Sequence, residues 1–291
     1  MAGLAECGPW DAVVDCSGYV PENVLTVART LAPKVTHAVF MSTVSVYGDW
    51  PIKPLSEAST VLDCPPDADA DYGTDTEDGP TKYGYQKSGC EAATRLAFGE
   101  TRVALLRPGV ILGPHEYVGR LPWWLRRVAR DGLVVAPGSP SRSIQPIDVR
   151  DVADFALLSA EQRLTGAFNL AAPIVRDTFG DLIDACIRAT GSDARAFWVD
   201  DDMLLAHGVR QWSEVPLWRT FDGVWKVSAA RAAGAGPGLT SRPLDGTVLD
   251  TWAWMQSAAE LNDHERASEL GLTADHERAL LLIARGQMGS P

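Results

Sequence analysis

The stretch Tyr83-Gly84-Tyr85-Gln86-Lys87 places a tyrosine four residues before a lysine. On a helix, side chains at this spacing lie on one face, about a turn apart. A free phenol has a pKa near ~10 and is a poor base at neutral pH, but an adjacent ammonium favours the phenolate. We therefore predict a helix on which Lys87 lowers the pKa of Tyr83, so that Tyr83 can exchange a proton with a hydroxyl or carbonyl group.

Three other stretches accompany this pair. Ser42-Thr43-Val44-Ser45-Val46-Tyr47-Gly48 follows an apolar run and offers hydroxyl groups that could orient a reacting oxygen. Downstream come Arg107-Pro108-Gly109-Val110-Ile111-Leu112-Gly113-Pro114 and Ile147-Asp148-Val149-Arg150-Asp151-Val152-Ala153, the second of which is typical of an acid-capped helix start. In this order, the four stretches resemble the motifs of the extended short-chain dehydrogenase/reductase family, the NAD-dependent epimerase/dehydratase group.

The resemblance covers most of residues 10–260. Within the family it is closest to the actinobacterial reductase and epimerase proteins often labelled isoflavone-reductase-like. It implies an α/β fold, a Rossmann-like doubly wound parallel sheet with a small C-terminal substrate lobe. We expect a partial NAD(P)-binding core at residues 1–170 and the lobe at residues 171–291, with an interleaved boundary.

The resemblance also implies residue roles. Catalysis falls to Tyr83 and Lys87, with Thr43 steadying the substrate oxygen; Ser42 is its neighbour and Ser45 a stand-in. The residues implied to contact NAD or NADP are Ser42, Tyr83, Lys87, Pro108 and Val110.

Four residues are candidates for contacting the substrate. His115, Arg120 and Trp124 follow the strand end and could line a pocket, although a lone His is commonly a surface or core residue and Trp pairs commonly pack. Arg142 lies two residues away from where sugar-nucleotide enzymes of the family keep a pyrophosphate-binding Arg. Val110 stands where those epimerases usually place an Asn. Both departures weaken a sugar-nucleotide interpretation.

The start of the sequence departs from the family. Its enzymes open with a strand, a G-x-x-G-x-x-G loop and a helix N-terminus that holds the cofactor pyrophosphate. Here Trp10-Asp11-Ala12-Val13-Val14-Asp15-Cys16-Ser17-Gly18 resembles the family's fourth strand, so about 60 residues of the nucleotide-binding half are expected to be missing, at ~30 residues for each βαβ unit. Gly234-Ala235-Gly236-Pro237-Gly238 follows a helical pattern and is interpreted as a helix stop and loop. We expect the chain to bind the cofactor weakly or not at all.

The same gap makes residues 11–16 an expected sheet edge. Ala12, Val13 and Val14 are apolar, whereas a protected edge carries charge, proline or a bulge. Exposed apolar patches mark partner surfaces or aggregation sites. The sequence therefore predicts homo-oligomerisation through this edge, or a partner that supplies strands.

The amino-acid composition excludes several other classes of protein. The 291 residues are 46% hydrophobic, as in globular proteins, and the net charge of −12 argues against nucleic-acid partners. No apolar run approaches the ~18–20 residues of a membrane span, and no signal peptide opens the sequence. Five scattered cysteines without C-x-x-C suit a reducing, cytoplasmic setting. The acidic, proline-rich residues 49–80 contain no His, which favours a solvated loop or lid over a metal site.

Apolar periodicity predicts an alternation of strands and helices, which favours right-handed βαβ units and a parallel sheet. The predicted strands are 10–17, 36–42, 102–107, 133–136, 143–147 and 166–170, and the predicted helices are 21–31, 81–99, 119–130, 151–160, 177–190 and 273–285.

Three functions follow from these patterns. The leading hypothesis is an NAD(P)-dependent oxidoreductase or epimerase acting on a hydroxyl or carbonyl of a small molecule, which as this shortened chain could be inactive. The alternative is a non-catalytic binding or regulatory protein derived from the same fold. A cofactor-free acid/base enzyme is the third. The sequence does not indicate the substrate, the choice between NAD and NADP, or the reaction direction.

Overall fold

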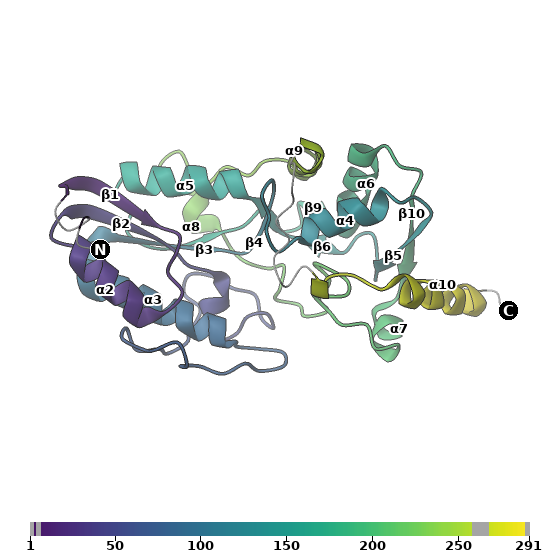
Figure 1. Cartoon of the computed structure of the whole chain (residues 1–291), viewed down its shortest axis with the longest axis horizontal. Coiled ribbons are helices and arrows are strands. Elements are labelled where there is room, and N and C mark those ends of the chain that lie inside the picture. The colour runs from purple at the N-terminus through teal and green to yellow at the C-terminus, as the bar shows by residue number, and fades with distance from the viewer. Residues whose placement is uncertain (1–2, 4–6, 258–267, 289–291) are drawn as a thin grey trace. The chain divides into compact units, whose positions relative to one another are not determined.

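The computed structural model describes residue 3 and residues 7–257 and 268–288 (Figure 1). The chain forms two compact units, each built from three segments. The first unit contains residues 1–110, 150–174 and 221–241, and the second contains residues 111–149, 175–220 and 242–291. The boundary expected at residue 170 falls inside the middle segment of the first unit.

The first unit is built on a four-stranded parallel sheet. Its strands are β1 (Trp10–Asp15), β2 (Val35–Met41), β3 (Val103–Pro108) and β8 (Gly166–Leu170), in the order β1-β2-β3-β8. Each pair is joined through at least one helix, as parallel strands require. The predicted α/β class and the parallel sheet are confirmed, and the fold is Rossmann-like.

Helices cover the sheet on both faces (Figure 1). The helices α2 (Pro21–Leu31) and α3 (Lys82–Phe98) pack on one face. Ala167 belongs to the core beneath them, and its neighbour Phe168 points to the other face, where its ring lies 5.6 Å from that of Phe155 in α5 (Val149–Glu161). This alternation is that of a strand buried on both faces.

The strand β1 forms one edge of this sheet and pairs, within the described residues, with β2 alone. None of its six residues is fully buried, whereas all six of β3 are. A cavity of about 190 Å³ beside it is lined mainly by apolar side chains of β1, α2, β2 and α3. The predicted apolar edge is confirmed, and association through it stays a prediction.

The residues 49–80 form a long connection without a named helix or strand. It is tied to α3, because the Gln86 side-chain amide donates to the carbonyls of Asp69 (2.9 Å) and Tyr72 (2.7 Å), and the Ser88 hydroxyl donates to that of Leu62.

The described residues contain no group of three His, Cys, Asp or Glu side chains that could hold a metal ion. None of the described helices is long and apolar enough to cross a membrane.

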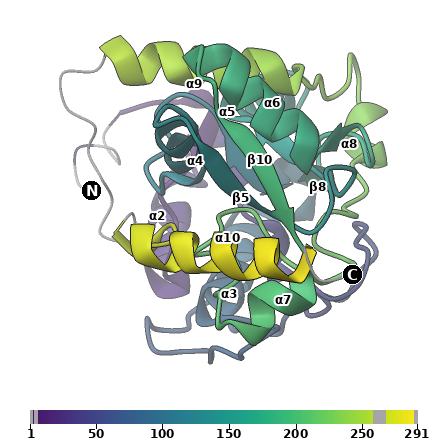
Figure 2. The same cartoon turned by 90° about the vertical axis from the view of Figure 1, so that its right-hand side faces the viewer.

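The second unit holds a two-stranded parallel sheet, β5 (Leu133–Pro137) with β10 (Arg195–Val199). Figure 2 shows this pair between α6 and α10. The Thr178 and Asp181 side chains form a capping box at the start of α6. The helices of this unit are α4 (Arg120–Val128), α6 (Phe179–Thr190), α7 (Asp201–Ala206), α9 (Leu244–Ser257) and α10 (Ala274–Met288). The remaining short elements of the whole chain are η1 (Val44–Val46), η2 (Glu100–Arg102), α8 (Ala230–Ala233), β4 (Val110–Leu112), β6 (Ser143–Ile144), β7 (Pro146–Asp148) and β9 (Asp177–Thr178).

Several elements differ from expectation. The strand predicted at 143–147 is split into β6 and β7, and the helix predicted at 177–190 is preceded by β9. Asp151 is not a helix cap, because α5 begins at Val149 and Asp151 lies in its first turn. An acidic side chain there still interacts favourably with the helix dipole.

The acid sensitivity of the first unit should depend on His37 in β2. This side chain is buried, and its Nε2 has no hydrogen-bond partner among the described residues. Burial, and secondarily the charge of Arg163, lowers the pKa of His37 below its usual value. The unfolded chain therefore takes up a proton at higher pH than the folded one, and stability is lost as the pH falls below the unfolded pKa of ~6.5.

A comparison with His37→Gln checks this account. We expect the free energy of unfolding of the wild type to fall relative to that of the variant between about pH 7 and pH 5, by at most ~1.4 kcal/mol per pH unit for one proton. Urea unfolding across this range gives both curves. Parallel curves would show that His37 does not titrate differently on folding.

Candidate active site

The carboxyl ends of the four parallel strands lie along one edge of the main sheet. These ends are Asp15 in β1, Met41 in β2, Pro108 in β3 and Leu170 in β8. In open α/β sheets, ligands bind in the crevice outside this edge. The candidate site therefore lies among the side chains and loops that follow these residues.

Lys87 reaches this edge from α3. Its Nζ donates to the carbonyl oxygens of Gly18 (2.7 Å) and Met41 (2.6 Å), just past β1 and at the end of β2, and lies 4.4 Å from the centre of the Phe40 ring. Burial lowers the pKa of the Lys87 ammonium, and nearby acidic groups oppose that shift. The two carbonyls and the aromatic face favour the charged amine. Lys87 thus fixes a positive charge between two strand ends.

Tyr83 lies one helical turn before Lys87, on the face of α3 that the spacing predicts. Its side chain is 41% exposed, which leaves part of it open to a ligand. The Tyr19 ring, in the loop after β1, lies 6.0 Å from the Tyr83 ring and 5.5 Å from Lys87 Nζ. Sequence reasoning missed Tyr19, whose signal is an aromatic residue directly after the glycine that follows a strand.

The three hydroxyls of the segment after β2 differ in their partners. Ser42 is buried, and its Oγ donates to Glu91 Oε1 at 2.6 Å. Thr43 Oγ1 accepts from the Ser45 amide at 3.2 Å and lies 3.3 Å from the Ser45 hydroxyl. Of the three, Ser45 is the most exposed, being half-buried. Ser42 was expected to contact the cofactor, but its hydroxyl is committed to Glu91, and we assign it to the framework instead.

Gly84 lets α3 approach this hydroxyl-bearing segment closely. A Cβ at Gly84 would lie 2.2 Å from the Ser45 carbonyl oxygen, a distance that no side chain tolerates. The Gly84 amide is also bonded to the side chain of the N-cap residue Thr81, at 3.2 Å. The absence of a side chain at Gly84, beside Tyr83, therefore allows the start of α3 to pack against the segment that carries Thr43.

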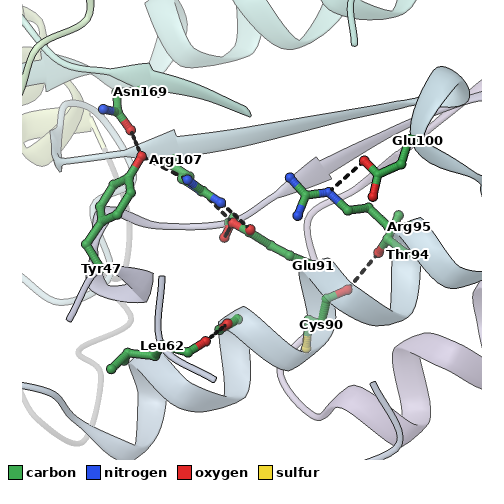
Figure 3. Close-up of polar contacts among 11 residues, drawn as sticks. Tyr47, Leu62, Cys90, Glu91, Thr94, Arg95, Glu100, Arg107 and Asn169 are labelled. Atoms are coloured by element: carbon green, nitrogen blue, oxygen red, sulfur yellow. Dashed lines mark hydrogen bonds and ion pairs between the residues drawn. The ribbon is translucent and has the colours of Figure 1, made fainter. Parts of the chain in front are cut away.

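A buried polar network lies one turn further along α3 (Figure 3). Arg107 forms a bidentate ion pair with Glu91, with Nε–Oε1 at 2.8 Å and Nη2–Oε2 at 2.5 Å, and its Nη1 donates to Tyr47 Oη at 2.9 Å. Tyr47 Oη in turn donates to Asn169 Oδ1 at 2.8 Å. Burial opposes the charge on Arg107, but Glu91 outweighs that effect and raises the pKa of the guanidinium. The network joins α3, β3 and β8 and was not foreseen beyond the Arg-Pro motif itself.

The residues after Arg107 lie at the same carboxyl edge of the main sheet. Pro108 is the last residue of β3, the Gly109 amide donates to the Leu170 carbonyl at 2.9 Å, and Val110 begins β4. Both Pro108 and Val110 are buried. Their contact with a nicotinamide ring remains a prediction.

The four residues considered for the substrate all belong to the second unit. The guanidinium of Arg142 pairs with Asp201, and that of Arg120 pairs with Glu116 at 3.0 Å. His115 is exposed, with its ring 4.9 Å from that of Trp254.

Trp124 is a core residue and should be removed from the substrate candidates. Its side chain is 0% exposed, and its indole N–H donates to the Pro216 carbonyl at 2.9 Å. Its ring also packs edge-on against Phe179. A fully buried indole with its donor satisfied has no surface left for a ligand.

The model of the NAD-dependent epimerase/dehydratase family matches residues 11–171, which contain all but the first residue of β1, the strands β2 to β8 and all the site residues of the first unit. The chain belongs to this family. The match spans more than half of the sequence and includes both the Tyr83–Lys87 pair and the strand ends described above.

Solved structures confirm the fold. The UDP-Glc/GlcNAc 4-epimerase of Campylobacter jejuni is 14% identical, with 88% of this chain and 82% of that chain covered and a TM-score of 0.63. The Bordetella bronchiseptica enzyme WbmG, solved with NAD and UDP, is 16% identical over 84% of this chain and 71% of its own, with a TM-score of 0.56. The Thermotoga maritima UDP-glucose 4-epimerase, solved with UDP-glucose, is 16% identical over 86% and 78%, with a TM-score of 0.56. A search of curated proteins found no match.

Proposed function

We propose that this chain is an NAD(P)-dependent oxidoreductase or epimerase that acts on a hydroxyl or carbonyl group of a small molecule. The observation that carries the proposal is the placement of Lys87, whose ammonium is fixed at the ends of β1 and β2 with Tyr83 one turn away. This is where ligands of open α/β sheets bind. Membership of the family supports the same reaction class.

The proposed chemistry is a proton exchange at Tyr83. In the oxidising direction the phenolate takes the proton of a substrate hydroxyl, and in the reducing direction the phenol returns it to the carbonyl oxygen. The fixed charge of Lys87 favours the phenolate, and Thr43 steadies the substrate oxygen. A bound nicotinamide would supply the hydride chemistry.

The described residues fit only one end of that cofactor. Lys87, Pro108 and Val110 lie at the carboxyl edge, where the nicotinamide end would bind. The pyrophosphate needs a glycine-rich turn into a helix N-terminus, but the turn after β1 leads into α2 at Pro21, which has no N–H, and the N-cap Val20 provides no side-chain hydrogen bond.

Titration with NADH and NADPH tests the proposal. We expect the 291-residue chain to bind with a Kd near the millimolar range, equivalent to about −4 kcal/mol, because the pyrophosphate lacks backbone donors in the described residues. Lys87→Met should weaken the binding further, since it removes the fixed charge. Saturation at micromolar cofactor would contradict the partial fit. Absence of saturable binding up to several millimolar would favour a non-catalytic binding protein of the same fold.

A panel of candidate substrates, assayed at millimolar cofactor, tests which substrate class the chain accepts. Two of the structural neighbours were solved with UDP or UDP-glucose. In this chain the Val110 side chain carries no amide group, and the Arg142 guanidinium is engaged by Asp201. We therefore propose a carbonyl or alcohol substrate without a nucleotide, and the assay compares UDP-glucose with small aliphatic and aromatic ketones.

A further inference from the structure

The buried network beneath the Tyr83–Lys87 pair reaches the hydroxyl-bearing segment directly. Ser42 Oγ donates to Glu91 Oε1, the same oxygen that accepts from Arg107 Nε. Glu91 and Arg107 are each 1% exposed, and Ser42 is 3% exposed. The carboxylate and the guanidinium cancel each other's charge, so the network is electrically neutral and shielded from water.

Glu91 occupies a defined place relative to the reacting pair. It follows Lys87 by four residues and Tyr83 by eight, so the three side chains lie on one face of α3. On that face Tyr83 is exposed, Lys87 meets the ends of β1 and β2, and Glu91 meets β3 through Arg107. The Glu91 contact therefore fixes the rotation of the helix that presents Tyr83.

Ser42 is held by one hydrogen bond from its backbone and one from its side chain. Its amide donates to the Leu106 carbonyl at 2.7 Å, while its hydroxyl donates to Glu91. The next residue, Thr43, is extended, with φ −163° and ψ 156°. Successive side chains of an extended chain point to opposite sides, so anchoring Ser42 inward turns Thr43 away from the network.

We propose that Glu91, held by Arg107, is a positioning residue that anchors Ser42 and thereby sets Thr43 against Tyr83. This inference rests on the proposed function of the site, because Thr43 and Tyr83 are its reacting groups. Ser42 is then a structural hydroxyl and Thr43 the one that serves the substrate. The anchor acts through geometry, and neither Glu91 nor Arg107 exchanges a proton with the substrate.

The test uses a double variant that removes the anchor without leaving a buried charge. Glu91→Leu with Arg107→Met replaces a buried ion pair by apolar side chains of similar size, a change that is often neutral for stability. The matched control is Arg188→Met with Asp245→Leu, which removes an exposed ion pair from the second unit. A thermal melt establishes that both double variants fold.

Hydrogen exchange followed by mass spectrometry gives a readout independent of turnover. In the anchor variant, we expect the amides of residues 42–47 to exchange at least about tenfold faster than in the wild type, because their tether to α3 is lost. Residues 21–31 of α2 and the control variant should exchange as in the wild type. Unchanged exchange at 42–47 in the folded anchor variant would overturn the proposal.

Kinetics separate positioning from stability. We expect the folded anchor variant to lose about 10²-fold in kcat with KM little changed, because a displacement near 1 Å suffices for such a loss. Thr43→Val should lose a similar factor, and so should Ser42→Ala, because it removes the hydrogen bond through which Glu91 anchors this segment. Wild-type kcat in the anchor variant, in Ser42→Ala or in Thr43→Val would overturn the assignment. Absence of turnover in every form, wild type included, would count against the proposed function alone, and hydrogen exchange would then decide the anchor.

Discussion

Replacing Tyr83 by phenylalanine is expected to lower kcat by about 10²–10⁴-fold, the range that positioned general acid–base groups contribute. The substitution keeps the aromatic ring, which lies 6.0 Å from that of Tyr19, and removes only the hydroxyl that exchanges the proton. Cofactor affinity should change little, because Lys87 remains fixed by Gly18 and Met41. Initial rates at saturating substrate, with cofactor titrated, give both quantities.

Tyr85→Phe is the matched control for this prediction. Tyr85 lies on the same helix two residues later, and its ring packs edge-on against Tyr72 at 6.3 Å. At this spacing it does not share a helix face with Tyr83, so its hydroxyl should be dispensable for turnover. A near-normal kcat in Tyr83→Phe, or an equal loss in Tyr85→Phe, would remove Tyr83 from the mechanism.

The second large effect is expected from Arg107→Met, which should lower the free energy of unfolding by about 3–5 kcal/mol. The single substitution leaves Glu91 buried without its bidentate partner and deprives Tyr47 Oη of a donor. An unpaired carboxylate in the interior is costly because water cannot solvate it. Urea unfolding of the two proteins measures the difference.

An exposed ion pair serves for comparison. The side chains of Arg188 and Asp245 are 60% and 66% exposed, and Arg188→Met should change the free energy of unfolding by no more than about 1 kcal/mol. If Arg107→Met were as mild as Arg188→Met, the buried network would contribute little to the fold. The anchor variant with both charges removed should be more stable than Arg107→Met alone.

Much of the first unit is predictable from local sequence. The apolar runs at β1, β2 and β3 mark parallel strands, and the spacing of Tyr83 and Lys87 places both on one helical face. These signals are local, because each depends on residues within one or two turns of one another. The family's motifs then place the helix beside the strand ends.

The missed features depend on contacts between distant segments. Ser42 bonds to Glu91, 49 residues later, and Tyr47 bonds to Asn169, 122 residues later. No periodicity connects such positions, so the sequence shows polar residues without showing which of them pair. The same limit explains Trp124, whose burial depends on packing against Phe179.

The central claim is that Tyr83 works with a nicotinamide cofactor on a hydroxyl or carbonyl group, and transfer of a label tests it most directly. Wild type, Tyr83→Phe and Tyr85→Phe are each incubated with millimolar NADH or NADPH deuterated at the reactive carbon, together with the ketone panel. Mass spectrometry then measures deuterium in the product alcohol. The account predicts a deuterated alcohol with wild type and Tyr85→Phe, reduced by about 10²-fold or more with Tyr83→Phe. Equal deuterium transfer by Tyr83→Phe and wild type, or none by any form with any member of the panel, would contradict it.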